Sequence, residues 1–358
     1  MGASRVVGIS VVIATVFATG ASAHIRATVT CGETVTASVV LTTDLANCPG
    51  TGLVVRADGI TIDLGGHTVS GTNAPKSEGI ADDGHGGVKI LNGTITSFRV
   101  HGVALRHAAG ASISRLTVRA IGTGRKNAQG AAGILLDHSP GSTVSISAVS
   151  SAWDGLVLIH SPMSKVIGSH FDGNGNNGLE ASCGSDTLSV SASQAAGNRG
   201  SGMVVEALRG ADLLGNTLTG NGRDGALLFD VRDTAIRGSR ATGNKDGIEL
   251  YGGRKGSRHN QISEDKAAYN AHAGIWVHGD NRRSGADSNG LSGNFANHNG
   301  LGGGILVGGS AARNDLFANT ANANRGRGIT AVAGTIDGGS NRASENRGSP
   351  QCLGVKCR

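Results

Sequence analysis

The sequence has 358 residues, of which 60 are glycine, 5 are proline and 3% are aromatic, and its formal charge is +6. The glycines do not fall at every third position, which excludes a collagen helix. Apolar residues recur in phase along the chain, which argues against disorder. A mild positive charge without a basic recognition helix gives no reason to expect a nucleic-acid partner.

The first 23 residues have the features of a secretory signal peptide. Arg5 supplies the positive charge, residues 6–19 form the apolar run, and Ala21-Ser22-Ala23 has the small side chains of a cleavage site. The apolar run is too short to span a bilayer, and no later segment is long enough. We therefore expect cleavage near Ala23 and a secreted or periplasmic protein without a membrane span.

The five cysteines suit an oxidising compartment and lie mostly near the two ends of the chain. Cys31 and Cys48 fall in residues 24–51, which we expect to form an N-terminal cap and the leading strand. Cys352 and Cys357 fall in a C-terminal tail, residues 348–358. We predict a disulfide in each pair, although spacing alone does not prove the connectivity, and Cys183 is left over.

Residues 52–347, between these ends, repeat a short motif that begins with glycine and continues apolar-x-apolar. The motif recurs about every 23 residues, with no helical pattern between its copies. A repeat of this length built from short strands predicts one coil of a solenoid per copy. The lead glycines are Gly52, Gly79, Gly102, Gly133, Gly155, Gly178, Gly202, Gly225, Gly247, Gly274, Gly304 and Gly328.

Within each coil, the residues one and three places after the lead glycine are nearly always aliphatic, as Leu156 and Leu158 are after Gly155. Strand alternation places both on one face, which we assign to the interior. Two more short strands follow in each coil. Three parallel strands per coil predict an all-β, single-domain right-handed parallel β-helix solenoid of about twelve coils.

Asparagine recurs shortly before many of the lead glycines. Because asparagine tolerates the left-handed conformation and has both a donor and an acceptor, this series predicts an internal ladder at one corner. Turn residues that do not stack would fit the same fold. The predicted ladder residues are Asn174, Asn198, Asn221, Asn244, Asn270 and Asn324.

Residues 57–69 (ADGITIDLGGHTV) resemble the opening coil of secreted proteins of the pectate-lyase-like superfamily with the right-handed β-helix repeat, the carbohydrate-binding and sugar-hydrolysis group. Residues 341–346, together with residues 351–357, are similar to the tail of such proteins. The resemblance covers essentially the mature chain and implies a β-helix with a polysaccharide partner. It leaves the activity open, because the superfamily contains lyases, hydrolases and epimerases. It would allow Ca²⁺, but the residues themselves indicate no cofactor.

Two adjacent coils combine acidic, aromatic and imidazole side chains at the positions two and four places after the lead glycine. Glu249 and Tyr251 follow Gly247, and Trp276 and His278 follow the next lead glycine. These positions should point outward, on the face where β-helix enzymes of the superfamily bind polysaccharides. Stacking of the coils would pair Glu249 with Trp276 and Tyr251 with His278.

The same two coils carry basic insertions after their strands, and their cations would neutralise uronate carboxylates. We predict Tyr251, His278 and Lys255 as catalytic residues, since a positioned base and a cation suit β-elimination or C5 epimerisation of a uronic-acid polymer. Glu249 and Trp276 are predicted to bind substrate, together with the basic residues. The alternative to a functional site is that these two coils only carry long loops with solvated charges. The predicted basic substrate-binding residues are Arg254, Arg258, Arg282 and Arg283.

A hydrolase is less favoured than a lyase or epimerase. Residues 82–86 contain the strings Asp-Asp and Gly-His-Gly, which resemble those of polygalacturonases. In that family the two strings lie on different coils, whereas here they are fused, so we expect a glycine-rich loop. The Asp-Pro-His-Glu string of C5-epimerases is also absent from the sequence.

A second series lies five residues after the lead glycine on four successive coils: His107, His138, His160 and Cys183. Imidazole and thiolate ligands so aligned suggest a transition metal as an alternative function. Strand parity places the series inward or at a corner, and a straight stack is too long for one ion to reach all four. We therefore expect stacked corner histidines and no metal.

An apolar stripe lies at outward positions of several coils and suggests a covering segment, residues 119–132, or self-association. The function expected overall is recognition, with or without cleavage or epimerisation, of an acidic polysaccharide. The rival hypothesis is a non-catalytic surface, adhesion or structural rod that binds polysaccharide. The stripe consists of Leu135, Val157, Ile159, Val204, Leu227 and Phe229.

Overall fold

The computed structural model describes residues 25–27, 29–122, 130–280 and 285–358. The predicted signal peptide, the middle of the predicted covering segment, and both Arg282 and Arg283 lie outside these residues. The described part of the chain contains 38 strands and no helix. No helix that could cross a membrane is found in it.

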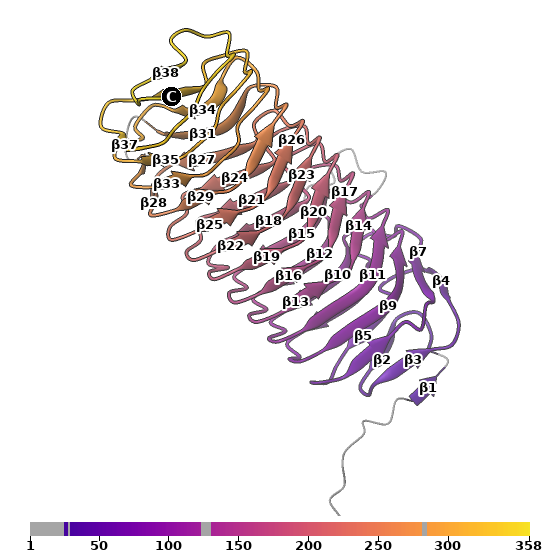
Figure 1. The fold of residues 1–358 in the computed structure, drawn as a ribbon. Helices are drawn as coiled ribbons and strands as arrows, with labels where there is room; N and C mark the ends of the chain where they lie inside the picture. The colour runs from indigo at the N-terminus through magenta and orange to yellow at the C-terminus, as the bar shows by residue number, and fades with distance from the viewer. Residues whose placement is uncertain (1–24, 28, 123–129, 281–284) are drawn as a thin grey trace, which may run out of the picture.

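The strands form three columns that run the length of a rod (Figure 1). The first column is a 14-stranded sheet whose strands begin the successive turns. It consists of β2 (Glu33–Val35), β5 (Leu53–Val55), β8 (Glu78–Asp83), β10 (His101–Arg106), β12 (Ala132–Asp137), β15 (Asp154–Ile159), β18 (Leu179–Ser182), β21 (Met203–Glu206), β24 (Ala226–Phe229), β27 (Ile248–Gly252), β31 (Ala273–Gly279), β34 (Gly303–Val307), β36 (Ile329–Ala331) and β38 (Cys352–Leu353).

The other two columns form one 22-stranded sheet because β9 (Lys89–Thr96) and β11 (Ser112–Arg119) run through both. The second column also contains β1 (Ile25–Ala27), β3 (Val39–Leu41), β6 (Thr61–Asp63), β13 (Thr143–Ser145), β16 (Lys165–Ile167), β19 (Ser189–Ser191), β22 (Asp212–Leu214), β25 (Ala235–Arg237), β29 (Gln261–Ser263), β33 (Gly290–Ser292), β35 (Asp315–Phe317) and β37 (Ile336–Gly339).

The third column also contains β4 (Leu45–Cys48), β7 (Thr68–Gly71), β14 (Ala148–Ser150), β17 (His170–Asp172), β20 (Gln194–Ala196), β23 (Thr217–Thr219), β26 (Arg240–Thr242) and β30 (Lys266–Ala268). Two short strands, β28 (Ser257–Arg258) and β32 (Ala286–Asp287), pair separately. Neighbouring strands are parallel and one turn apart in sequence, as β15 and β18 are. The predicted parallel β-helix is confirmed, with about 13 turns where the sequence indicates about twelve.

The interior is filled by the aliphatic pair of each coil, as the alternation predicts. Leu156 and Leu158 of β15 are fully buried, and Val157 between them is partly exposed. Each buried leucine contributes about 1.5–3 kcal/mol relative to an exposed one. On most turns the residue between the buried pair is partly exposed on the outer face, as in β15, β21 and β24. Leu135 of β12, predicted as an outward member of the apolar stripe, is buried instead, and so is Ala104 of β10.

The lead glycines are required by close packing of the coils. A Cβ atom on Gly178 would lie 2.7 Å from the carbonyl oxygen of Gly202 and 2.8 Å from the Asn198 Nδ2 atom. Its φ is not positive, so close packing, and not a left-handed turn, requires glycine at this position. Positive φ occurs at turns such as Gly197, where φ is 63°.

The predicted asparagine ladder is present and longer than expected. In each step, the Oδ1 atom of one asparagine accepts hydrogen bonds from the backbone N–H and the Nδ2 atom of the asparagine one turn before it, as Asn221 does from Asn198 (both 3.0 Å). A second corner carries a mixed series that the sequence did not reveal. The first ladder is Asn174, Asn198, Asn221, Asn244, Asn270, Asn299, Asn324 and Asn346. The second is Ser147, Ser169, Ser193, Asn216, Ser239, Asp265, Asn294, Asn319 and Asn341.

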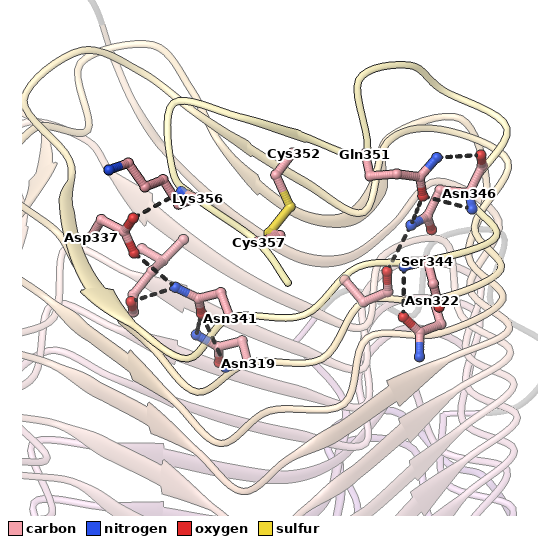
Figure 2. Close-up of a disulfide and its surroundings, with 12 residues drawn as sticks. Asn319, Asn322, Asp337, Asn341, Ser344, Asn346, Gln351, Cys352, Lys356 and Cys357 are labelled. Atoms are coloured by element: carbon pink, nitrogen blue, oxygen red, sulfur yellow. Dashed lines mark hydrogen bonds between the residues drawn. A yellow bond between two sulfur atoms is a disulfide. The ribbon is translucent and has the colours of Figure 1, made fainter.

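Disulfides join Cys31 to Cys48 and Cys352 to Cys357, the two pairs predicted from the sequence. Figure 2 shows the second disulfide in the chain that covers the last turn, beside the end of the asparagine ladder. There the Nδ2 atom of Asn346 donates to Gln351 Oε1 at 2.8 Å, which ends the ladder with a side chain of the tail. Cys183 is a free, exposed cysteine.

Candidate functional site

Strands β27 and β31 lie side by side near the C-terminal third of the rod and carry the four predicted outward residues. The register pairs Glu249 with Trp276 and Tyr251 with His278, as the repeat predicts. All four side chains are half-buried on the outer face of the first column, because they alternate with the buried residues of the same strands. The structure therefore brings these four residues together.

The rings on this face contact one another in a continuous row. Trp276 and His278 are stacked with centroids 3.8 Å apart, and Tyr251 lies 4.7 Å from His278. Phe229, on the preceding strand β24, stacks on Tyr251 with the two ring centroids 5.2 Å apart. We call these four residues the aromatic cluster. Phe229 appears in the sequence only as part of the apolar stripe, so its place beside Tyr251 was missed.

Glu249 fixes the orientation of His278. The Nε2 atom of His278 is 2.7 Å from Glu249 Oε1, and the two side chains are only 18% and 13% exposed. If Nε2–H donates to the carboxylate, Nδ1 of the neutral ring is left as an acceptor. A histidine held in this way by a carboxylate is a suitable general base.

Two buried aspartates lie next to Glu249 and were not singled out from the sequence. One carboxylate oxygen each of Asp224, Asp246 and Glu249 lie within 4.8 Å of one another. Burial, followed by the charges of Glu249 and Asp246, raises the pKa of Asp224 to about 7. Asp246 is also 2.6 Å from the Nδ1 atom of His272. The available signal was an aspartate directly before two successive lead glycines.

This buried acid cluster (Asp224, Asp246 and Glu249) has the donors that Ca²⁺ prefers. Asp224 Oδ1 and Asp246 Oδ2 are buried without a hydrogen-bond partner, so the residues present fit a cation. Lys245 Nζ lies 3.5 Å from Asp246 Oδ2 and supplies one positive charge there already. A bound Ca²⁺ would add positive charge at this cluster.

A groove of about 490 Å³ follows the strands of the first column at the corner beyond Phe229. We call it the basic groove. Parallel backbone bridges stack Arg209 and Arg232 on adjacent turns. The N–H groups of Lys255 and Gly256 donate to Asp230, which fixes the inserted loop against the groove. The groove is lined by Asp186, Ala207, Leu208, Arg209, Asp230, Arg232, Arg254 and Lys255.

The basic groove adjoins the aromatic cluster. Asp230, which lines the groove, directly follows Phe229 in the chain, and its N–H donates to the Tyr251 carbonyl at 3.0 Å. Burial raises the pKa of Glu206, the outward residue that ends β21, and the Lys255 ammonium opposes this shift. The site therefore combines rings, a carboxylate–histidine pair and cations along one stretch of the rod.

The other predicted basic residues contribute differently. Arg254 and Lys255 are exposed in the groove, whereas Arg258 is directed to Asp287, with Nη2 4.0 Å from Oδ2. Arg209 and Arg232 were not predicted, because nothing in a single coil shows that arginines of adjacent turns coincide. The positions of Arg282 and Arg283 are not among those described.

Residues 82–86 are not simply a glycine-rich loop, which corrects that expectation. Asp82 and Asp83 end strand β8, because they continue the register that pairs this strand with Leu105 and Arg106 of β10. Asp82 is buried and lies 2.8 Å from the Nδ1 atom of His85. Burial raises the pKa of Asp82.

The histidine series (His107, His138 and His160) lies at the corner that follows β10, β12 and β15, far along the rod from the aromatic cluster (Figure 1). The three residues have φ values of 54°, 48° and 47°, which turn their side chains out of strand alternation. They are exposed, so the inward alternative from strand parity is wrong. Their rings are stacked, as predicted, with centroids 5.1 and 4.4 Å apart.

The family model for the right handed beta helix region matches residues 78–240 and 132–289, which together span more than half of the chain. The protein therefore belongs to this family of right-handed β-helix proteins. A comparison with curated proteins found no match.

Among solved structures, the A-module of the mannuronan C-5 epimerase AlgE4 from Azotobacter vinelandii is 16% identical, with a TM-score of 0.58 over 92% of this chain and 88% of that chain. The periplasmic alginate epimerase AlgG is 14% identical, with a TM-score of 0.60 over 86% and 78%. The catalytic domain of a GH87 α-1,3-glucanase is 11% identical, with a TM-score of 0.53 over 92% and 63%. At these identities the likeness establishes the fold alone.

Proposed function

We propose that the protein is an exported β-helix protein that binds an acidic, uronate-containing polysaccharide across the aromatic cluster and the basic groove, and acts on it there. The observation that supports this most is the adjacency of the Glu249–His278 pair and the ring of Tyr251 to a groove containing four cations. A polymer that follows the outer face would meet both. The names of the epimerases of similar fold include alginate and mannuronan, which is compatible with this substrate class.

Each part of the site has a role in binding. The half-buried rings of Trp276 and Tyr251 offer apolar edges on the outer face, against which the C–H groups of a sugar can pack. The guanidinium groups of Arg209 and Arg232 offer donors to a carboxylate, and Arg232 is held in place by a hydrogen bond from its Nη2 atom to the Lys255 carbonyl at 2.9 Å. Because the two arginines lie on adjacent turns, they present repeated cations to a repeated anion.

The reaction that suits these residues begins with removal of the proton on C5, the carbon next to the uronate carboxylate. His278 or Tyr251 takes this proton, and the electron pair of the C–H bond moves into the carboxylate, where Lys255 or an arginine stabilises the charge. Return of a proton to the opposite face gives the C5 epimer. Departure of the O4 oxygen as an alcohol, after it gains a proton, gives a C4=C5 double bond.

The proposed location is outside the cytoplasm. Two disulfides at the ends of the rod are typical of secreted or periplasmic proteins. The predicted signal peptide at residues 1–23 is compatible with this location. The proposed partner, an extended acidic polysaccharide, would be met by the protein outside the cytoplasm.

The proposal is tested on alginate, pectate and glycosaminoglycans in ²H₂O. A lyase creates ultraviolet absorbance from the new double bond, and an epimerase introduces deuterium at C5. We expect the variant Tyr251→Phe/His278→Ala to lose at least a hundredfold of either signal. The control is Tyr269→Phe/His298→Ala, because these two residues also form a Tyr–His stack, at 4.9 Å, and Tyr269 is exposed at the corner after β30.

The same assay separates the rival hypothesis of a non-catalytic rod. Binding without absorbance or exchange for every polymer would contradict the catalytic part of the proposal. Full turnover in Tyr251→Phe/His278→Ala would show that the chemistry lies elsewhere. Self-association through the apolar stripe stays a prediction, which light scattering checks by the mass of the purified protein.

A further inference from the structure

We infer that the corner bearing His138 and His160 is a binding site for a borderline divalent transition metal, Zn²⁺ or Cu²⁺. This site is separate from the proposed polysaccharide site. It consists of His138, His160 and Asp137, each of which offers one ligand atom, and these atoms lie within 4.8 Å of one another. Imidazole nitrogen with one carboxylate oxygen is a donor set that both ions favour.

The solenoid holds the two histidines in fixed relation. The backbone N–H of His138 donates to the Ile159 carbonyl at 2.9 Å, and Asp137 pairs with Ile159 in the parallel register of β12 and β15. Both histidines have φ near 47–48°, so both leave the strand in the same direction. Their rings therefore face each other at 4.4 Å with an angle of 25°.

Asp137 and His138 already place two donor atoms side by side. The Asp137 Oδ1 atom lies 2.7 Å from His138 Nδ1, and an ion bound between them would take the place of the proton that the two atoms share. His107 on the preceding turn has a different carboxylate partner, since its Nδ1 atom lies 3.1 Å from Asp83.

The side chains need only a small movement to close on an ion. Two ligands at about 2.1 Å from one metal are separated by no more than about 4.2 Å, and by less in a tetrahedral site. The required approach is less than about two ångströms, and the half-exposed side chain of His138 has room to rotate. The nitrogen lone pairs lie in the ring planes, so the two stacked rings must also rotate toward a common ion. These are side-chain rotations, which leave the backbone of the coils unchanged.

The test uses untagged protein, stripped with a chelator, loaded with Zn²⁺ or Cu²⁺ and dialysed. We expect about one retained equivalent by elemental analysis, and nitrogen hyperfine splitting in the electron paramagnetic resonance spectrum of the Cu²⁺ form. His138→Ala/His160→Ala should lose the metal, with at least a hundredfold weaker binding by titration calorimetry. Circular dichroism confirms that each variant is folded.

Matched variants keep the assignment specific. His170 is an exposed histidine near an aspartate, with Nδ1 3.6 Å from Asp172, and His170→Ala should retain the metal. His107→Ala and Cys183→Ser should retain it too, because neither residue belongs to the assigned set. The assignment is overturned if wild-type protein retains no metal, if His138→Ala/His160→Ala retains one equivalent, or if any of the three control variants loses it.

Discussion

Asp265 occupies a ladder position that neighbouring turns fill with serine or asparagine. Its Oδ1 atom accepts from the Ser239 N–H at 2.7 Å, as the ladder requires, but its Oδ2 atom is buried without a partner. Asn294, one turn later, instead donates its Nδ2 group to Asn319 and to the Ile262 carbonyl. A carboxylate cannot make these donations unless it is protonated. Burial raises the pKa of Asp265 to about 7, against the lowering effect of the hydrogen bond from the Ser239 N–H.

Asp265→Asn should therefore stabilise the protein above neutral pH by about 1–3 kcal/mol. With an unfolded pKa of about 3.9, the unfolded chain loses this proton at lower pH than the folded chain, so wild-type stability falls as the pH rises from about 4 to about 7. The asparagine variant should lack that contribution to the pH dependence. Urea unfolding at several pH values measures both effects. Asp315→Asn, at an exposed position, is the control, and a destabilised Asp265→Asn would contradict the explanation.

The repeating element is a coil whose close contacts are made at the lead glycine. A methyl group at Gly178 would meet Ala195 Cβ and Asn198 Nδ2, both at 2.8 Å, and a backbone carbonyl of the next turn. The candidate site depends on the equivalent contact at Gly247. A Cβ there would meet the carbonyl oxygen of Gly274, at the point where the turn carrying Tyr251 packs against the turn carrying His278.

Gly178→Ala should cost more stability than Gly197→Ala. Overpacking at Gly178 is expected to cost about 3 kcal/mol or more. Gly197 has nothing near its Cβ position, so alanine there costs only about 1–2 kcal/mol for its positive φ. Urea unfolding compares the two variants. Equal losses would show that backbone conformation, rather than contact between turns, explains the lead glycines.

The sequence predicted the first column and its register well, because one lead glycine and two aliphatic residues recur in nearly every coil. It did not predict the second ladder, whose residues vary among serine, asparagine and aspartate. It also missed Asp224 and Asp246. Their carboxylates approach Glu249 through side-chain conformations on successive turns, which the repeat pattern does not specify. The exposure of His138 and His160 depends on a positive φ, which strand parity does not reveal.

At the scale of the whole molecule, the rod is a linear stack in which each turn contacts its neighbours. In such a stack, unfolding starts at the ends, and the interior is protected by the turns on both sides. The disulfides lie at both ends, and the Cys31–Cys48 disulfide encloses a sequence separation of 17 residues. The candidate site lies several turns from either disulfide (Figure 1).

Cys31→Ser/Cys48→Ser should lower the stability of the first turns by about 3 kcal/mol, the value expected for a loop of this length. Hydrogen exchange should then be faster in residues 29–71 and unchanged at β27 and β31. Cys183→Ser should alter neither region. Faster exchange throughout the rod would mean that the protein unfolds as one cooperative unit and not from its ends.

The central claim is that the outer face recognises the carboxylates of a polysaccharide. Titration calorimetry with a uronate oligosaccharide and with its carboxyl-reduced form tests this directly. We predict at least tenfold weaker binding of the reduced form, and an equal loss in Arg209→Ala/Arg232→Ala/Lys255→Ala. The control Arg325→Ala/Arg342→Ala/Arg347→Ala, which removes three exposed charges from the last turns, should bind normally. Equal affinity for the two sugars, or normal binding by the groove variant, would contradict the account.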